Sequence, residues 1–96
     1  MIKGKTKSGF EFAVKENAMD DMRLIDTMSA ILAPGASKAE ILQLNSRSAD
    51  ILLGKEQKEA LYEHIAQQHD GKVPVAVFAQ ELKEVMKSLG KEAEKN

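Results

Sequence analysis

The chain has 96 residues, which is the size of one small domain. With 43% hydrophobic and 30% charged residues, its composition is that of a globular protein and not of a disordered one. The net charge of -1 provides no field that would attract nucleic acid or an anionic membrane. Because a core this small leaves little room for a deep catalytic pocket as well, we expect neither an enzyme nor a bound cofactor.

Nothing in the sequence indicates export or a membrane partner. Residues 1–7 lack the apolar run of a signal peptide, and no stretch approaches the ~20 apolar residues that a membrane span needs. The chain contains no cysteine, which excludes disulfides, thiolate metal sites and cysteine nucleophiles, so folding needs no oxidising compartment. We therefore expect a soluble protein of the cytoplasm.

Residues 1–15 are predicted to form a β-hairpin with its turn at Ser8-Gly9. After the turn, Phe10, Phe12 and Val14 recur with the period of two that turns one face of a strand inward. The same alternation before the turn places Ile2, Gly4 and Thr6 inward, and Lys3, Lys5 and Lys7 outward. No aromatic residue is interleaved with the lysines for base stacking, so we interpret them as a solvated face that discourages edge pairing.

A first helix is predicted over about residues 18–33, where apolar residues recur every three to four positions. The expected inward stripe consists of Met22, Ile25, Met28 and either Ile31 or Leu32. Asn17 is the expected N-cap, and Asp20 and Asp21 fall in the first turn, where carboxylates complement the helix dipole. Pro34-Gly35 ends this helix.

Further helices are predicted over about residues 38–53, 55–69 and 75–89. The capping box Ser37-Lys38-Ala39-Glu40 starts the first of these, and Gly54 separates it from the next. Asn45-Ser46-Arg47-Ser48 is either a polar break or an exposed turn of a continuous helix. Asp70-Gly71 stops the third helix, and Pro74 precedes the last.

The predicted architecture is one α+β domain over residues 1–90. An N-terminal β-hairpin is followed by about four short helices packed as a small bundle, and Gly90 closes the last helix before a polar tail over residues 91–96. The last two helices are expected to bury Leu61, Tyr62, Ile65, Phe78, Leu82, Val85, Met86 and Leu89.

No motif indicates catalysis or metal binding. His64 and His69 are five residues apart and lie on different sides of a helix, so we interpret them as surface or helix-end residues. Gly4-Lys5-Thr6 is similar to the end of a phosphate-binding loop but lacks the upstream glycine. The acidic cluster of Asp20, Asp21 and Asp26 is at a helix start, where the dipole explains it. We expect no catalytic, cofactor-binding or metal-binding residue.

The methionines are the candidate partner-binding residues. Met19, Met22 and Met28 fall on the first predicted helix and Met86 on the last. Methionine adapts its shape well enough to serve binding surfaces, although core filling is the competing interpretation. A helix-turn-helix over residues 51–68 is the weaker alternative, because its glutamates would repel DNA. An interaction domain, for example a small adaptor, is therefore favoured over a DNA-binding regulator.

Four short sequence segments, in their order and spacing, resemble those of the tail assembly chaperones of long-tailed bacteriophages and prophages, especially those of Gram-positive hosts. They are Ser8-Gly9-Phe10-Glu11-Phe12, Asp20-Asp21-Met22, Ile51-Leu52-Leu53-Gly54-Lys55-Glu56-Gln57-Lys58 and Asp70-Gly71-Lys72-Val73-Pro74-Val75. Together they span nearly the whole chain, and none is a catalytic signature. The total length of about one hundred residues also agrees with that family.

The resemblance implies a non-catalytic protein of the bacterial host cytoplasm that is absent from the mature virion. Its partner would be the tape measure protein, which the chaperone keeps soluble while tail tube subunits polymerise around it. The resemblance also implies a longer form made by ribosomal frameshifting, which would recruit the major tail tube protein; Glu94-Lys95-Asn96 can be encoded by a slippery A-rich heptamer. No nucleic-acid or membrane partner is expected, and a homo-oligomer is left open.

Overall fold

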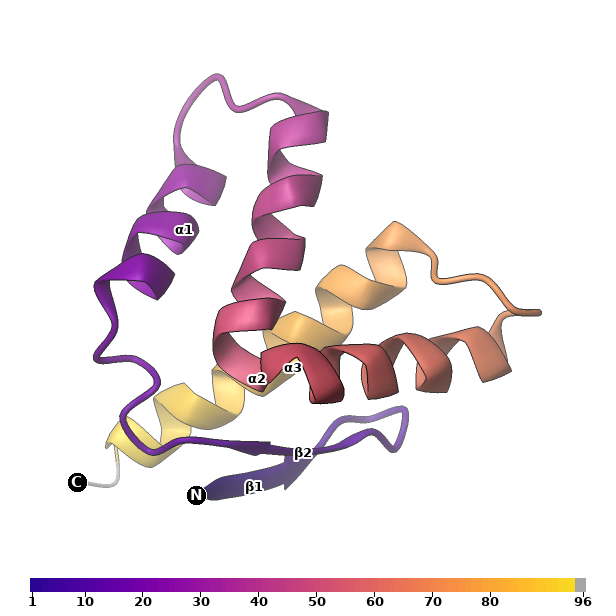
Figure 1. The fold of residues 1–96 in the computed structure, drawn as a ribbon. Helices are drawn as coiled ribbons and strands as arrows, with labels where there is room; N and C mark the ends of the chain where they lie inside the picture. The colour runs from indigo at the N-terminus through magenta and orange to yellow at the C-terminus, as the bar shows by residue number, and fades with distance from the viewer. Residues whose placement is uncertain (95–96) are drawn as a thin grey trace.

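An antiparallel β-hairpin and three helices make up the computed structural model, which describes residues 1–94, with side chains to residue 89 (Figure 1). The elements are β1 (Ile2–Lys5), β2 (Glu11–Val14), α1 (Met22–Leu32), α2 (Lys38–Gln68) and α3 (Val75–Glu94). The predicted α+β class and the N-terminal hairpin are confirmed, whereas the prediction of about four helices is wrong, since there are three in this part of the chain.

The hairpin has the predicted faces. Gly4 pairs with Phe12 across the two strands, and Phe12 is only 4% exposed. A Cβ atom built on Gly4 would lie 2.5 Å from Cζ of Phe12. The Phe12 ring therefore covers Gly4, and only a residue without a side chain leaves room for it there. The turn has Gly9 at a φ of +99°, a conformation that glycine adopts without strain.

The free edge of β2 is closed by a side chain of α2. Gln57 accepts a hydrogen bond from the Ala13 N–H at 2.8 Å and donates one to the Ala13 carbonyl at 2.7 Å. Ala13 lies opposite Lys3, and the groups of Ala13 that face away from β1 are the ones that Gln57 engages. The amide of Gln57 therefore substitutes for the next strand of the sheet.

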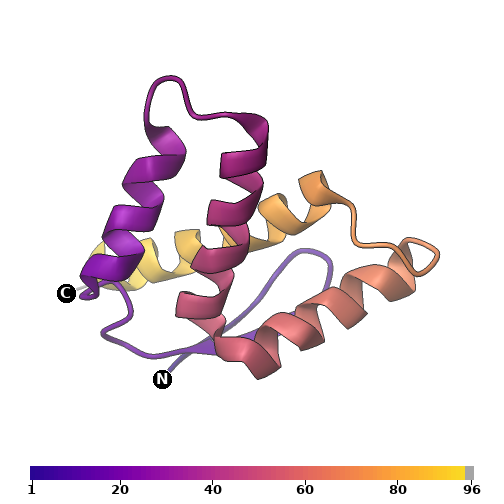
Figure 2. The same ribbon diagram turned by 45° about the horizontal axis from the view of Figure 1, so that its top comes forward.

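α2 joins the helices predicted over 38–53 and 55–69 into one element, in which the predicted break at Gly54 is present as a kink. It continues through the polar residues 45–48 and kinks at Gly54, which has a φ of 77° and a ψ of 165°. Only glycine tolerates this conformation, so one residue makes the sharp bend seen in Figures 1 and 2 without a connecting turn. Gln57 also donates to the Leu53 carbonyl at 2.8 Å, next to the kink.

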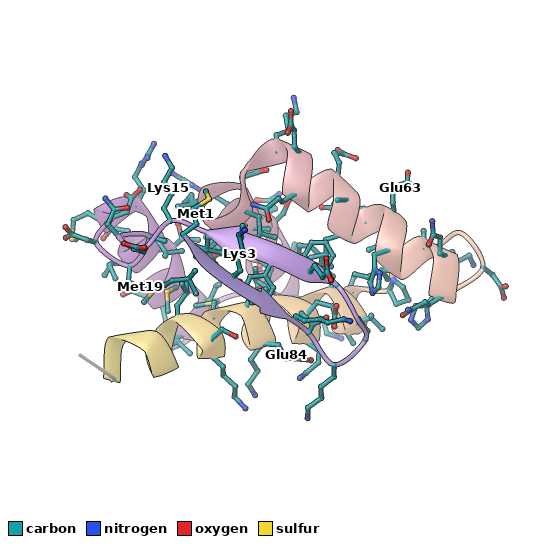
Figure 3. All side chains as sticks on the ribbon, turned by 90° about the horizontal axis from the view of Figure 1, so that it is seen from below. Met1, Lys3, Lys15, Met19, Glu63 and Glu84 are labelled. Atoms are coloured by element: carbon teal, nitrogen blue, oxygen red, sulfur yellow. The ribbon has the colours of Figure 1, made fainter. Side chains whose placement is uncertain are left out.

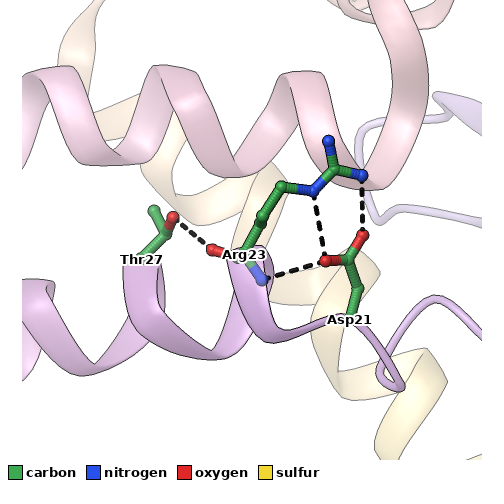
Figure 4. A network of polar contacts seen from close by, with 3 residues as sticks. All are labelled: Asp21, Arg23 and Thr27. Atoms are coloured by element: carbon green, nitrogen blue, oxygen red, sulfur yellow. Dashed lines mark hydrogen bonds and ion pairs between the residues drawn. The ribbon is translucent and has the colours of Figure 1, made fainter.

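α1 begins later than the 18–33 prediction, at Met22, because residues before it form turns. Its N-cap is Asp21 rather than Asn17: the Asp21 carboxylate accepts from the Arg23 N–H at 2.9 Å and pairs with the Arg23 guanidinium (Figure 4). Arg23 lowers the pKa of Asp21 through these hydrogen bonds.

The inward face of α1 also differs from the predicted stripe. Its fully buried residues are Leu24 and Thr27. Of the predicted stripe, Ile25, Met28 and Ile31 are half-buried, whereas Met22 is 66% exposed and Leu32, the alternative to Ile31, is 82% exposed. Thr27 tolerates burial because its hydroxyl donates to the Arg23 carbonyl at 2.6 Å, one turn earlier (Figure 4). A stripe read from apolar residues alone therefore misplaces the face.

Both ends of α2 lie where they were predicted, whereas α3 ends later than predicted. Ser37 caps α2 as predicted, since its hydroxyl accepts from the Glu40 N–H at 3.1 Å, and His69 is the C-cap of α2. α3 does not stop at Gly90 but continues to Glu94. A single glycine costs a helix only about 1 kcal/mol, and the residues after it are good helix formers. The predicted polar tail over 91–96 is therefore helical to Glu94, and its last two residues lie outside the described ones.

The elements pack around one core (Figures 1 and 2). α1 and the first half of α2 form an antiparallel pair, α3 crosses behind this pair, and the hairpin lies against α3 and the second half of α2. The hairpin and all three helices contribute to the core, whose least exposed large side chains are Val14, Leu24, Leu61, Ile65 and Val85. Of the residues expected inside, Tyr62 and Met86 are only partly buried.

Candidate functional site

An apolar groove of about 490 Å³ lies where α1, α2 and α3 meet. Its apolar lining consists of Met28, Ile31, Leu32, Ala79, Leu82 and Met86. Asn45 of α2 and the two α3 residues Lys83 and Lys87 complete it. Most of these apolar side chains keep part of their surface accessible, which is the property of a docking site for another apolar side chain.

The apolar lining of the groove comes from α1 and α3. Leu82, which is 2% exposed, belongs to the core and forms the floor. Met28 and Met86 pack against that core from the two helices and remain partly accessible. Leu32 stands at the end of α1 with 82% of its surface exposed, which leaves a large apolar side chain at the mouth of the groove.

A smaller apolar hollow of about 210 Å³ adjoins the groove, because Asn45 lines both. Leu42 and Val75, which are 42% and 52% exposed, lie at this hollow, and Tyr62 and Phe78 pack together beneath it with ring centroids 5.3 Å apart. Apolar surface therefore continues on both sides of the first half of α2.

The structure brings together two of the four predicted methionines. Met28 and Met86 both line the groove. Met19 lies on the segment before α1 instead of on that helix (Figure 3), and Met22 is the first residue of α1; neither lines the groove. The apolar stripe of the sequence places Leu32 in the core as the alternative to Ile31, and its position beside the Pro34-Gly35 stop is the signal that it lies at an exposed helix end.

A polar cluster fixes the hairpin turn to the helices. The buried carboxylate of Glu81, on α3, accepts from the hydroxyls of Thr6 at 2.8 Å and Ser8 at 2.7 Å. Ser8 also lies 3.0 Å from Nε2 of His64. Since the only hydroxyl proton of Ser8 goes to Glu81, His64 is the donor in this contact.

This cluster differs from a catalytic triad. In a triad the imidazole accepts the serine proton, and the carboxylate binds the other ring nitrogen. Here the carboxylate of Glu81 accepts the proton of Ser8 directly, and His64 donates to Ser8. The arrangement holds the turn in place and does not prepare a serine nucleophile.

Glu84 strengthens the same attachment one helical turn away. Its carboxylate accepts from the Lys7 N–H at 2.8 Å, and Figure 3 shows it on α3 beside the hairpin. The hydrogen bond from Lys7 is the largest cause that lowers the pKa of Glu84, and the Gln80 amide and the charges of Lys7 and Lys87 act in the same direction. The turn is thus held by two carboxylates of α3.

A metal site, a membrane-spanning helix and a helix-turn-helix motif would each indicate another function. Among the described residues, no three His, Asp or Glu side chains gather as metal ligands do. Within residues 1–94, none of the helices has the length and hydropathy to cross a bilayer. Residues 51–68, the helix-turn-helix alternative, contain the Gly54 kink and no separate turn, and Glu56, Glu59 and Glu63 are exposed.

Comparisons of the chain with known protein families, curated proteins and solved structures found no match. The resemblance to tail assembly chaperones therefore rests only on the four sequence segments and the chain length, and the candidate site rests only on the structure of this chain.

Proposed function

We propose that this protein binds an amphipathic helix of another protein in the groove between α1 and α3, and acts as a tail assembly chaperone. The observation that carries the proposal is the groove itself, which Met28 of α1 and Met86 of α3 line together with the buried Leu82. Helix-in-groove recognition uses such a site, with apolar anchors spaced by three or four residues on the bound helix.

The dimensions of the groove favour weak and repeatable binding. A groove of about 490 Å³ accepts only a few side chains, and burying one Leu or Phe contributes about 1.5–3 kcal/mol before the entropic cost of association. The methionine walls adapt to anchors of different shape. A chaperone that masks successive segments of a long helix and is later displaced needs these properties.

The resemblance supplies the identity of the partner. A tape measure protein is rich in amphipathic helix, so exposed apolar stripes make it prone to self-association. One groove per chaperone would cover one short segment, and many copies would cover the length of the partner. In this proposal the protein acts in the cytoplasm of the bacterial host without catalytic turnover and is absent from the mature virion, and a longer frameshifted form contacts the major tail tube protein.

Co-expression with the presumptive tape measure protein tests the proposal. We expect the tape measure protein to be insoluble alone, and to become soluble and co-purify with this chain. Leu32→Gln should abolish the rescue without unfolding the protein, because Leu32 is 82% exposed. Met22→Gln is the matched control, since Met22 is 66% exposed on the same helix but lies outside the groove.

Two outcomes of this experiment would contradict the proposal. One is a tape measure protein that is equally soluble with and without this chain and forms no complex at micromolar concentration. The other is a complex that Leu32→Gln leaves intact. If the groove instead captures a different helical protein, the more general adaptor function takes the place of the chaperone function.

A further inference from the structure

We propose that the helix bound in this groove carries carboxylates beside its apolar stripe, and that Lys83 and Lys87 of α3 select it. This inference rests on the proposed function, because it concerns the occupant of the same groove. It adds a charge requirement to what would otherwise be an apolar contact, and so determines which amphipathic helices the protein accepts.

The two lysines are placed to meet a bound helix. Lys83 and Lys87 lie one turn apart on α3 and both line the groove, with Leu82 and Met86 next to them as floor and wall. Residues four apart lie on the same side of a helix. The apolar lining is therefore bordered by two cations in a row, and the lining contains no carboxylate.

The charge of Lys83 is available to a partner. The ion pairs formed by described side chains use other cations, namely the amino group of Met1, Arg23 and Lys58. The positions of α3 that neighbour Lys83 on the helix surface hold Ala79, Gln80, Met86 and Lys87. Lys83 and Lys87 are both exposed, so both charges can reach a bound helix.

The same charges argue against a second copy of this chain as the occupant. A two-fold dimer formed groove to groove would bring Lys83 and Lys87 of one copy against the same residues of the other. Like charges that meet in an interface repel each other. An acidic amphipathic helix satisfies both the apolar lining and the lysines, so the observations favour a different protein.

Two synthetic peptides test the inference. Both are about 20 residues long, with leucines at helical spacing; one carries glutamates beside the leucine stripe and the other carries lysines at the same positions. Binding is measured by fluorescence anisotropy at low and high salt. We expect the glutamate peptide to bind about 3- to 10-fold more tightly than the lysine peptide at low salt, and expect high salt to remove the difference.

Charge reversal gives the matched comparison. The double variant Lys83→Glu/Lys87→Glu should invert the preference and favour the lysine peptide. The control Lys55→Glu/Lys72→Glu changes the net charge equally at exposed positions outside the groove, and should leave the preference unchanged. Circular dichroism and thermal melting of both variants establish that the fold is retained.

The results separate this inference from the proposed function. Equal binding of the two peptides, with loss of both in Leu32→Gln, would overturn the charge requirement and leave the apolar groove as the binding site. Binding that Leu32→Gln does not weaken, or no binding of either peptide, would contradict both the charge requirement and the groove. If the control variant also inverted the peptide preference, the overall charge of the protein, and not Lys83 and Lys87, would determine which peptide binds more tightly.

Discussion

Gln57 and Ala13 are joined by two hydrogen bonds of opposite direction, at 2.8 and 2.7 Å, so one side chain satisfies both outward-facing backbone groups of a strand residue. The same amide binds the Leu53 carbonyl at the kink of α2. A single residue therefore connects the hairpin, the kink and the second half of α2. This connection pairs the outward-facing groups of Ala13 and ties the hairpin to α2 beside its kink.

Gln57→Ala should destabilise the protein by about 1–3 kcal/mol, because it leaves the partly buried N–H and carbonyl of Ala13 without partners. Gln57→Glu should also destabilise, since a carboxylate cannot donate to the carbonyls of Ala13 and Leu53. Urea unfolding measures both changes, with Gln67→Ala as the control at an exposed position of the same helix. A free energy of unfolding within about 0.3 kcal/mol of the wild type in both variants would contradict this role of the amide.

Gly54→Ala should cost about 1–3 kcal/mol. No atom lies within 4 Å of a Cβ built on Gly54, so the cost would come from the backbone conformation and not from a clash. The straightened α2 would also displace α1 and the groove. Thermal melting and peptide binding should therefore decline together, whereas Glu56→Ala, at an exposed position beyond the kink, should leave both unchanged.

Phe12→Ala should cost about 3–5 kcal/mol, enough to unfold much of a domain of this size. Phe12 is 4% exposed and its ring covers Gly4, so its removal leaves a cavity between hairpin and helices. Glu11→Ala, at the exposed position beside it, is the control. A melting temperature of Phe12→Ala within a few degrees of the wild type would mean that the hairpin does not belong to the core.

The attachment of the hairpin turn should weaken in acid. The folded pKa of Glu84 lies below its ordinary value of 4.5, so the unfolded chain binds more protons and Glu84 adds stability above that pH. The added stability is lost as the pH falls through the folded pKa. Because the carboxylate is accessible to solvent, we expect at most about 1 kcal/mol.

Urea unfolding between about pH 6 and pH 3 measures this effect. The wild type should lose more stability toward acid than Glu84→Gln, which keeps an acceptor for the Lys7 N–H but has no titrating group. Glu63→Gln, on the second half of α2 (Figure 3), removes a carboxylate from an exposed position as a control. Parallel pH profiles of the wild type and Glu84→Gln would contradict the contribution of Glu84.

Local patterns predicted the elements better than they predicted their contacts. The period of two around Phe12 and the capping box at Ser37 each depend on neighbouring residues, and the structure confirms both. The inward position of Thr27 depends on a hydrogen bond to its own backbone, which an apolar stripe does not reveal. The predicted break at Gly54 is confirmed by its non-helical φ and ψ, but the sequence does not show that one helix, α2, continues on both sides of it.

The groove could not be predicted from the sequence, because its lining comes from separate helices that only the fold brings together. Met28 and Met86 were both candidates, but only the crossing of α1 and α3 brings them to one site and leaves Met19 and Met22 outside it. The crossing follows from the kink at Gly54 and from packing of the whole core. No periodic pattern within one helix contains that information.

The most direct test of the account is an NMR titration of protein labelled with ¹³C at its methionine methyl groups. The presumptive tape measure protein, or a helical fragment of it, is added while the methyl signals are followed. Met28 and Met86, which line the groove, should shift or broaden, whereas Met19 and Met22 should stay unchanged and serve as internal controls. Binding that moves the signals of Met19 or Met22 and leaves those of Met28 and Met86 in place would contradict the groove as the site at which this protein acts.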